Sequence, residues 1–295
     1  MRCKDREGNF IGADDGQDKF LEKLYSSRIG RQMVKVLIRP SVSKAGGWFL
    51  DRKISTVAIK PFVKTNGISL EDYEKNRFDS YNDFFTRRVK AERRPVDMDS
   101  SHLIAPCDSK LTVYQITEDA EFTIKNTLYS MESLTRSKKL AEKYRGGYLL
   151  LFRLTVDDYH RYCYVDRGKK SGNHIINGVF HTVNPIANDH YPIYKENTRC
   201  ISFLKSANFG TLMMIEVGAL MVGKIVNYHE EKMVERGEEK GRFEFGGSTI
   251  ILCLKKDKAV IDDDILENSR LGIETKVRYG EKIGKKKRNR PIKKL

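Results

Sequence analysis

Three residues in short polar stretches could together activate a nucleophile. Ser248 interrupts the apolar run FEFGGSTIILCL at residues 243–254, His160 lies in TVDDYHRYCYVDRG, and Asp108 lies in APCDSK. An imidazole that takes a proton from a hydroxyl, with a carboxylate to orient it, is the set that deprotonates a serine. We therefore take Asp108, His160 and Ser248 as candidate catalytic residues.

The backbone in front of the serine is unusual. Gly246 and Gly247 precede Ser248 in a segment that otherwise has the pattern of a strand, and glycine inside a strand marks a bulge, a bend or a close backbone approach. A kink at a sheet corner explains this without chemistry. A GxSxG elbow does not, because Ser248 is followed by Thr249 and Ile250. A structural kink and a reactive serine both remain open.

The composition indicates a globular chain with a strongly basic surface. Its 295 residues are enough for a sizeable core, and its net charge is +15. Such a charge favours nucleic acid, an anionic membrane or an acidic substrate. The end of the chain, GKKKRNRPIKKL, predicts a flexible basic tail at 285–295. No nucleic-acid-binding signature accompanies it, so we expect an anionic membrane surface and no nucleic acid as partner.

Cysteines and apolar stretches argue for an intracellular protein that meets membranes only from the surface. The five cysteines are widely spaced, without a CxxC pair or a zinc-ligand pattern, which is typical of reduced thiols. The N-terminus has no apolar signal-peptide core. The most apolar stretch, residues 211–226, is short and interrupted, and it predicts two buried strands rather than a membrane span.

Helical patterns come first in the chain. Apolar residues recur at roughly helical spacing over residues 19–39, with basic residues interleaved, a break near 26–30 and a stop at Pro40. Residues 69–95 begin with a capping sequence, continue with helical periodicity and end at a proline. The first segment could lie in a lipid headgroup layer or pack on its own domain. We expect a helical, membrane-associating region over 1–98.

Strand patterns follow. Short β-branched and aromatic runs are separated by Gly, Asn and Asp, and they read LTVYQI, YLLLFRL, HRYCYV, NGVFHTV, GTLMMIEV and STIILCL. They predict a β-rich catalytic domain over 99–284. The expected fold class is therefore α+β, with a helical N-terminal region followed by a largely antiparallel β body.

Several segments, in the same order along the chain, are similar to those of one enzyme family. FGGST resembles its maturation site, DYHR its histidine motif and APCDSK its aspartate segment; YNDFFTRRVKAERRPVD, FTIKNTLYSMESL, IEVGALMVGKIV and KGRFEFGGSTIILCL resemble further segments. The family is that of the phosphatidylserine decarboxylases of bacterial type. The resemblance covers roughly residues 20 to 284 and implies a flattened, barrel-like β sandwich.

The resemblance implies that Ser248 is the precursor of a covalent cofactor. Its hydroxyl would attack the Gly247 carbonyl, and cleavage between Gly247 and Ser248 would leave a β chain 1–247 and an α chain 248–295 whose first residue becomes a pyruvoyl group. His160, oriented by Asp108, would be the base. The pyruvoyl carbonyl would form a Schiff base with phosphatidylserine and accept the electrons left by carbon dioxide, which yields phosphatidylethanolamine. No metal is implied.

One motif departs from the family pattern. Many members carry a second histidine three residues after the first, whereas this chain reads HRYC, with Cys163 at that position. A thiol does not replace an imidazole as base without special surroundings. His181, in NGVFHTVNP, is therefore the alternative to His160. The aspartate segment also departs, at Cys107 and Ser109, but it retains Asp108.

The expected partners follow from the substrate. A diacyl lipid stays in its bilayer, so the resemblance implies a peripheral enzyme on the cytoplasmic side of the cell membrane. The α chain should stay with the β chain because STIILCL is an apolar strand, and a homodimer is compatible with the resemblance. Two other classes stay open: a Ser-His-Asp hydrolase that uses intact Ser248, and a non-enzymatic basic β domain that binds membranes.

Overall fold

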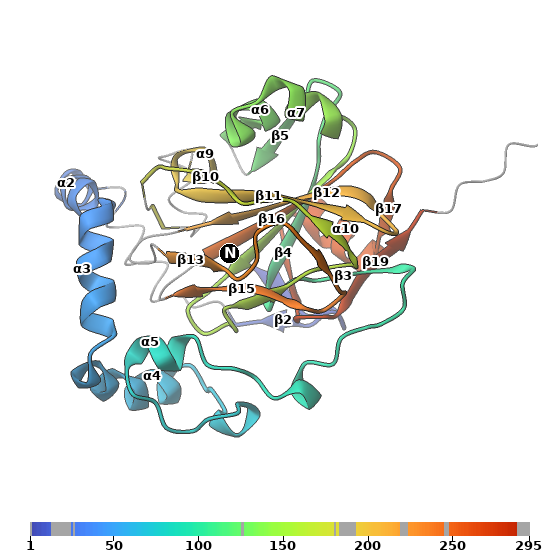
Figure 1. The fold of residues 1–295 in the computed structure, drawn as a ribbon. Helices are drawn as coiled ribbons and strands as arrows, with labels where there is room; N and C mark the ends of the chain where they lie inside the picture. Colours follow the sequence, from blue (N-terminus) through green and yellow to red (C-terminus); the bar gives the residue numbers. More distant parts are fainter. Residues whose placement is uncertain are drawn as a thin grey trace, which may run out of the picture.

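The described chain has the expected α+β fold (Figure 1). The computed structural model describes residues 2–12, 25, 27–124, 127–179, 181–182, 193–218, 224–244 and 248–287. Helices dominate up to residue 93, and strands dominate from residue 102 onward. The glycines at 246 and 247, on which the cleavage-site prediction rests, lie outside the described residues.

A large open sheet forms the centre of the described chain. All its pairings are antiparallel except that between β1 and β18. Its strands run in the spatial order β14 (Lys232–Val234), β9 (Gly168–Lys170), β11 (Arg199–Ser206), β12 (Gly210–Val217), β16 (Ser248–Leu254), β7 (Tyr148–Leu154), β4 (Ser109–Gln115), β18 (Glu274–Val277), β1 (Cys3–Lys4) and β2 (Phe10–Ile11), with β10 (His174–Ile176) beside β11.

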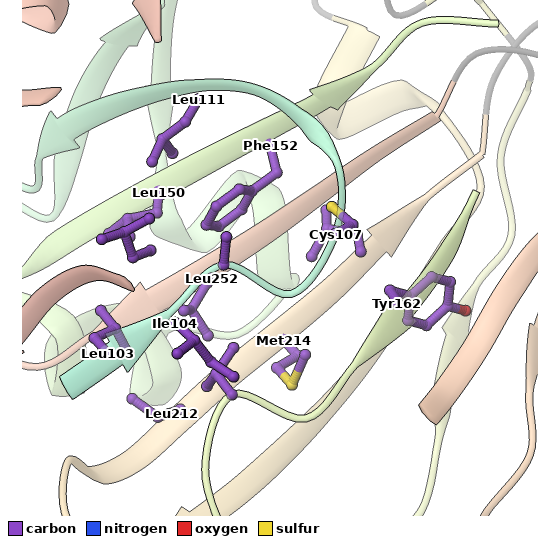
Figure 2. Packing of buried hydrophobic residues seen from close by; sticks show 14 of the residues in the cluster. Leu103, Ile104, Cys107, Leu111, Leu150, Phe152, Tyr162, Leu212, Met214 and Leu252 are labelled. Carbon is purple, nitrogen blue, oxygen red and sulfur yellow. The ribbon is translucent and has the colours of Figure 1, made fainter. Parts of the chain in front are cut away.

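Two small sheets share a core with one face of the large sheet. One contains β13 (Lys224–Asn227), β15 (Glu239–Glu244) and β8 (Arg161–Cys163), and the other contains β17 (Ala259–Ile261), β19 (Lys282–Lys286) and β3 (His102–Ile104). Figure 2 shows the core between them, in which Phe152 and Leu252 of the large sheet lie near Ile104 of β3. The layers form an open sandwich rather than a closed barrel.

The opposite face of the large sheet is covered as well. Alternate residues such as Leu151 and Ile251 share a second core with the segments above this face. Because both faces are buried, the central strands are apolar at nearly every position, as in YLLLFRL and STIILCL. The covering segments are β5 (Glu121–Ile124), β6 (Thr127–Ser130), α6 (Met131–Thr135), α7 (Lys138–Tyr144) and α9 (Ile193–Glu196), while α10 (Asp263–Arg270) packs on β4 and β18.

The N-terminal region differs from its prediction in two ways. It begins with the short strands β1 and β2 on the sheet edge, and residues 69–95 form three short helical turns instead of one helix. Tyr81, Phe84 and Phe85 of this segment instead fill a small separate core. The helical elements are α2 (Arg28–Leu37), α3 (Pro40–Leu50), η1 (Lys53–Ala58), α4 (Ile59–Thr65), η2 (Leu70–Asp72), α5 (Tyr81–Phe85) and η3 (Ala91–Arg93).

Helix boundaries in the first segment follow ordinary capping rules. The Ser27 side chain accepts a hydrogen bond from the Gly30 backbone N–H at 3.0 Å, so α2 begins where a break was expected. Pro40 does not end the helical region but opens α3 at its first turn, where a missing N–H costs nothing. Residues 13–24 lie outside the described part.

Most predicted strands are confirmed. GTLMMIEV, YLLLFRL and STIILCL coincide with β12, β7 and β16, and the stretch 211–226 contributes two strands rather than a membrane span. NGVFHTV is the exception, since its described residues make only an isolated bridge from Val179 to Asn197. β19 continues to Lys286, into the predicted tail. Among the described helices, none is long and apolar enough to cross a bilayer.

Candidate active site

The fold brings the three predicted residues to one end of the central strands β16, β7 and β4 of the large sheet. This end of the strands is called the catalytic edge below. Ser248 opens β16 and lies opposite Leu154, the last residue of β7. On the other side, β7 pairs with β4, and Lys110 lies opposite Arg153. Ser109, the first residue of β4, therefore lies opposite the same Leu154, and Asp108 directly precedes it. Neighbouring strands lie about 4.8 Å apart, so Ser109 and Ser248 are separated by roughly 10 Å.

His160 reaches this edge through the turn that follows β7. Its backbone carbonyl accepts a hydrogen bond from Phe243 N at 2.9 Å. Phe243 lies near the end of β15, and residues 245–247 connect β15 to Ser248. The turn between Leu154 and His160 thus contacts both flanks of the predicted scissile bond. Leu154 pairs with Ser248 after the bond, and His160 binds Phe243 before it.

The hydrogen bonds of His160 fix its tautomer. Nδ1 lies 2.8 Å from the backbone carbonyl oxygen of Asp158, which can only accept, so Nδ1 carries the proton. Nε2 then presents a lone pair, and it has no hydrogen-bond partner among the described residues. Burial lowers the pKa of His160 from 6.5 to about 4, although the Asp158 carboxylate opposes this shift. The imidazole is thus neutral at pH 7, as a general base must be.

Ser248 supplies the complementary group. The residue is fully buried, and its Oγ has no hydrogen-bond partner within the described chain. A buried polar group without a partner costs about 1–3 kcal/mol, so such atoms are uncommon and call for a functional explanation. The edge thus holds a buried hydroxyl donor and a buried imidazole acceptor, both unsatisfied.

Asp108 makes different contacts from those expected. Its carboxylate accepts hydrogen bonds from Arg94 Nε at 2.8 Å, from Arg94 Nη2 at 2.6 Å and from the Tyr279 backbone N–H at 2.8 Å. The group that orients His160 is instead the Asp158 carbonyl. The expectation that Asp108 orients His160 is therefore wrong for this structure. Asp108 fixes the segment that carries Arg94 to the start of β4.

Cys163 is unsuited to act as a base. The side chain is completely buried within the core between the sheets. Burial, the main cause, raises the pKa of the Cys163 thiol to about 12, so it stays protonated at neutral pH.

His181, the alternative base, lies at the same edge but on the other side of Ser248. The Asn197 side-chain amide forms hydrogen bonds with the His181 backbone N–H and carbonyl. The same amide donates to the carbonyl of Gly218, directly after β12, which is the strand that pairs with β16 on the side opposite β7. Burial lowers the pKa of His181 to about 4 as well. Its Nε2 lies 3.4 Å from the Glu196 carboxylate, whereas Nε2 of His160 is unengaged. This difference favours His160.

The two buried histidines predict loss of stability in acid. Both have a pKa of about 4 in the folded chain, against 6.5 for the unfolded chain. The unfolded chain therefore binds more protons between these values, and the free energy of unfolding falls as pH decreases from 6.5 to 4. The upper bound is roughly 3 kcal/mol per histidine. Urea unfolding of the uncut Ser248→Ala chain at several pH values would measure the slope. An unchanged slope after His160→Asn and His181→Asn would contradict this assignment.

The described residues hold no cluster of histidine, cysteine and carboxylate side chains that could bind a metal.

Sequence reasoning missed two contributors to the site. The Asp158 carbonyl belongs to the backbone and has no sequence signal. Arg87 stands in the quoted segment YNDFFTRRVKAERRPVD, but nothing in that pattern predicts its contact with the turn before His160.

The sandwich and its edge define an enzyme-like site built on a buried serine and a neutral histidine, and known sequences specify the family. Residues 81–285 match the family model described as phosphatidylserine decarboxylase. Phosphatidylserine decarboxylase proenzyme 2 of Clostridium acetobutylicum is 47% identical over 271 residues, which cover 92% of each chain. The proenzyme of Clostridium tetani is 42% identical over 274 residues, or 91% of this chain and 92% of that protein. The chain belongs to the phosphatidylserine decarboxylase family, whose members are enzymes.

Proposed function

We propose that this protein cleaves itself between Gly247 and Ser248 and then converts phosphatidylserine to phosphatidylethanolamine and carbon dioxide. The observation that carries the proposal is the pair of unsatisfied buried groups, Ser248 Oγ and His160 Nε2, at one sheet edge. Nε2 of His160 takes the hydroxyl proton, and Oγ attacks the Gly247 carbonyl carbon. The Gly247–Ser248 amide becomes an ester, and loss of the Ser248 Cα proton then breaks the ester Cβ–O bond and releases the β chain as a carboxylate. The dehydroalanine left at residue 248 tautomerises to an imine, and water replaces its nitrogen, which leaves as ammonia, to give the pyruvoyl carbonyl.

The site fits a pyruvoyl group made from Ser248. Its orphaned Oγ is the atom that this conversion removes, so maturation would eliminate one unsatisfied polar atom. A pyruvoyl group supplies a carbonyl that accepts an electron pair as a carboxylate leaves. Nε2 of His160 can return a proton at the same edge once it has taken one up, because the neutral ring carries its proton on Nδ1. The apolar interior of the sandwich solvates a carboxylate poorly, which favours its loss as carbon dioxide.

The α chain should remain in place after the cut. All seven residues of β16 are buried, and the strand pairs with β12 on one side and with β7 on the other. Release would expose these apolar side chains and leave both neighbouring strands unpaired. The two chains are therefore expected to form one permanent heterodimeric unit.

Carbonyl reagents test the mature site. We expect phenylhydrazine to abolish decarboxylation, because it condenses with a pyruvoyl carbonyl. The α chain should gain the mass of one phenylhydrazine less one water. A serine-directed phosphonate should leave the activity unchanged. The opposite pattern, with phosphonate inactivation and no hydrazine adduct, would show a hydrolase that uses intact Ser248.

The helical region offers a surface for the membrane. α2 and α3 project away from the sheet sandwich (Figure 1), and large apolar side chains on and beside them face solvent. Trp48 is 62% exposed, Ile54 66% and Val57 76%. Exposed lysines and arginines alternate with them, and Arg52 lies 4.2 Å from the Trp48 ring. Apolar side chains that enter the acyl boundary, with cations at the phosphates, suit peripheral binding to an anionic leaflet.

Vesicle binding tests this surface. Trp48→Ala and Val57→Ala are each expected to weaken binding to phosphatidylserine vesicles by about 3- to 10-fold, because each removes apolar area from the interface. Added salt should weaken binding further. Sedimentation with vesicles measures both effects, and Val260→Ala on the distant strand β17 is the control. Equal binding by all four proteins would remove these helices from the docking surface.

A further inference from the structure

Arg87 is a buried cation for which the described chain provides no carboxylate partner. The residue is 3% exposed, and it forms no ion pair within the described residues. Its guanidinium donates to the Phe84 carbonyl at 3.2 Å, to the Tyr73 hydroxyl at 3.2 Å and to the Asp157 carbonyl at 3.4 Å. Nε has no partner there. Burying a charge without a counterion is costly, so a missing anion is indicated.

The neighbouring arginine does have a carboxylate partner, so the lack of one is not shared by the whole segment. Arg88 forms a surface ion pair with Glu239 at 3.2 Å, and Arg161 bonds to the same carboxylate. Carboxylates are therefore available close by, but they are used by other cations. Asp158, beside Asp157, accepts from the Thr155 backbone N–H and from Lys110. Arg87 is left with a buried Nε that has no partner among the described residues.

Arg87 also lies beside the catalytic edge. Its bond to Asp157 places it on the turn that carries His160, and its charge contributes to the lowered pKa of His160. The His160 ring lies 4.1 Å from that of Phe85, two residues before Arg87. The rings of Tyr73 and Phe84 hold the guanidinium between them, each 4.5 Å from its carbon, and so fix its plane.

On the side away from His160, the same segment leads to the membrane-facing helices. Phe84 contacts Phe62 of α4, and α5 contacts both η1 and α3, which carry the exposed apolar side chains. The order in space is thus the catalytic edge, then Arg87, then the lipid-facing surface. In a phosphatidylserine molecule whose serine lies at Ser248, the order is serine, then phosphodiester, then glycerol and acyl chains.

We propose that Arg87 binds the phosphodiester of the phospholipid headgroup and so positions the serine group at Ser248; this rests on the function proposed above. A guanidinium presents paired donors that match phosphate oxygens. The substrate carboxylate is a poor alternative ligand. A cation bound to it would stabilise the negative charge that decarboxylation removes, and so would stabilise the ground state more than the transition state.

The test separates the phosphate from the carboxylate. The probes are glycerophosphoethanolamine, which has the phosphodiester but no carboxylate, and L-serine, which has the reverse. Equilibrium dialysis measures their binding to the purified protein and needs no activity. We expect Arg87→Met to weaken binding of glycerophosphoethanolamine about 10- to 100-fold and to leave that of L-serine unchanged. Arg87→Lys, which keeps the charge, should lose less, and Arg88→Met, the neighbouring control, should bind both like wild type.

Three results would overturn the proposal. Arg87→Met could bind glycerophosphoethanolamine like wild type, or it could lose L-serine instead, which would make Arg87 a carboxylate site. It could also fail to cleave itself while keeping the wild-type melting temperature, which would place Arg87 in maturation. If Arg87→Met does not fold, Arg87→Lys takes its place: a loss of glycerophosphoethanolamine binding, smaller than that expected for Arg87→Met, supports the proposal, and wild-type binding of this probe contradicts it. Failure of the proposed function is seen separately, as a wild-type protein whose mass shows one uncut chain.

Discussion

His160→Asn is expected to slow self-cleavage by about 10²- to 10⁴-fold, the usual contribution of a positioned general base. The asparagine amide N–H can replace Nδ1–H as donor to the Asp158 carbonyl, so the turn keeps its hydrogen bond while the base at Nε2 is lost. A time course of chain cleavage after synthesis, followed by denaturing gel or mass, gives the rate.

His181→Asn is the matched control, because His181 is the other buried histidine at this edge. Its Nε2 already faces Glu196, so we expect the rate of cleavage to change by less than about 10-fold. If His181→Asn stops cleavage and His160→Asn does not, the base is His181, and the unengaged Nε2 of His160 has another cause.

The second large effect concerns stability. Lys240→Met is expected to lower the free energy of unfolding by about 3–5 kcal/mol, because it leaves the Glu216 carboxylate buried without a cation. Both side chains are fully buried, and Lys240 Nζ lies 2.8 Å from Glu216 Oε1 and 2.8 Å from Asn227 Oδ1. The Asn227 amide in turn donates to Glu216 Oε2 at 3.0 Å. The network joins β12, β13 and β15, and β15 is the strand that precedes the proposed cleavage site.

The double variant Lys240→Met, Glu216→Leu provides the control. It removes both charges, so most of the lost stability should return, since apolar replacements of a buried ion pair are often neutral or stabilising. Urea unfolding of the uncut Ser248→Ala chain avoids complications from cleavage. A loss below about 1 kcal/mol for Lys240→Met, which surface ion pairs typically give, would contradict the account of this network.

Strand positions were predictable because their signal is local. β7, β12 and β16 are buried on both faces, so unbroken apolar runs marked them at their true bounds. Residues 69–95 were harder, because their apolar side chains have helical spacing but pack into a small core over short turns. β1 and β2 have two residues each and gain their structure from pairing with distant segments, which a short sequence cannot reveal.

The sequence supplied candidate site residues but not their contacts. The resemblance selected Ser248, His160 and Asp108, and the fold brings all three to one edge. The resemblance could not show that Asp108 pairs with Arg94, because a carboxylate turned toward Arg94 and one turned toward His160 fit the same motif. The buried pair of Lys240 with Glu216 was equally invisible, since two charged residues 24 positions apart have no local pattern.

The most direct test of self-cleavage at Ser248 is the denatured intact mass of the purified protein beside that of Ser248→Ala. We predict two fragments from the wild type, 1–247 and 248–295, with the smaller fragment lacking a free amine and carrying a carbonyl at its first residue. The Ser248→Ala protein should remain a single inactive chain. A wild-type chain that stays uncut yet still decarboxylates phosphatidylserine would contradict the proposed origin of the cofactor.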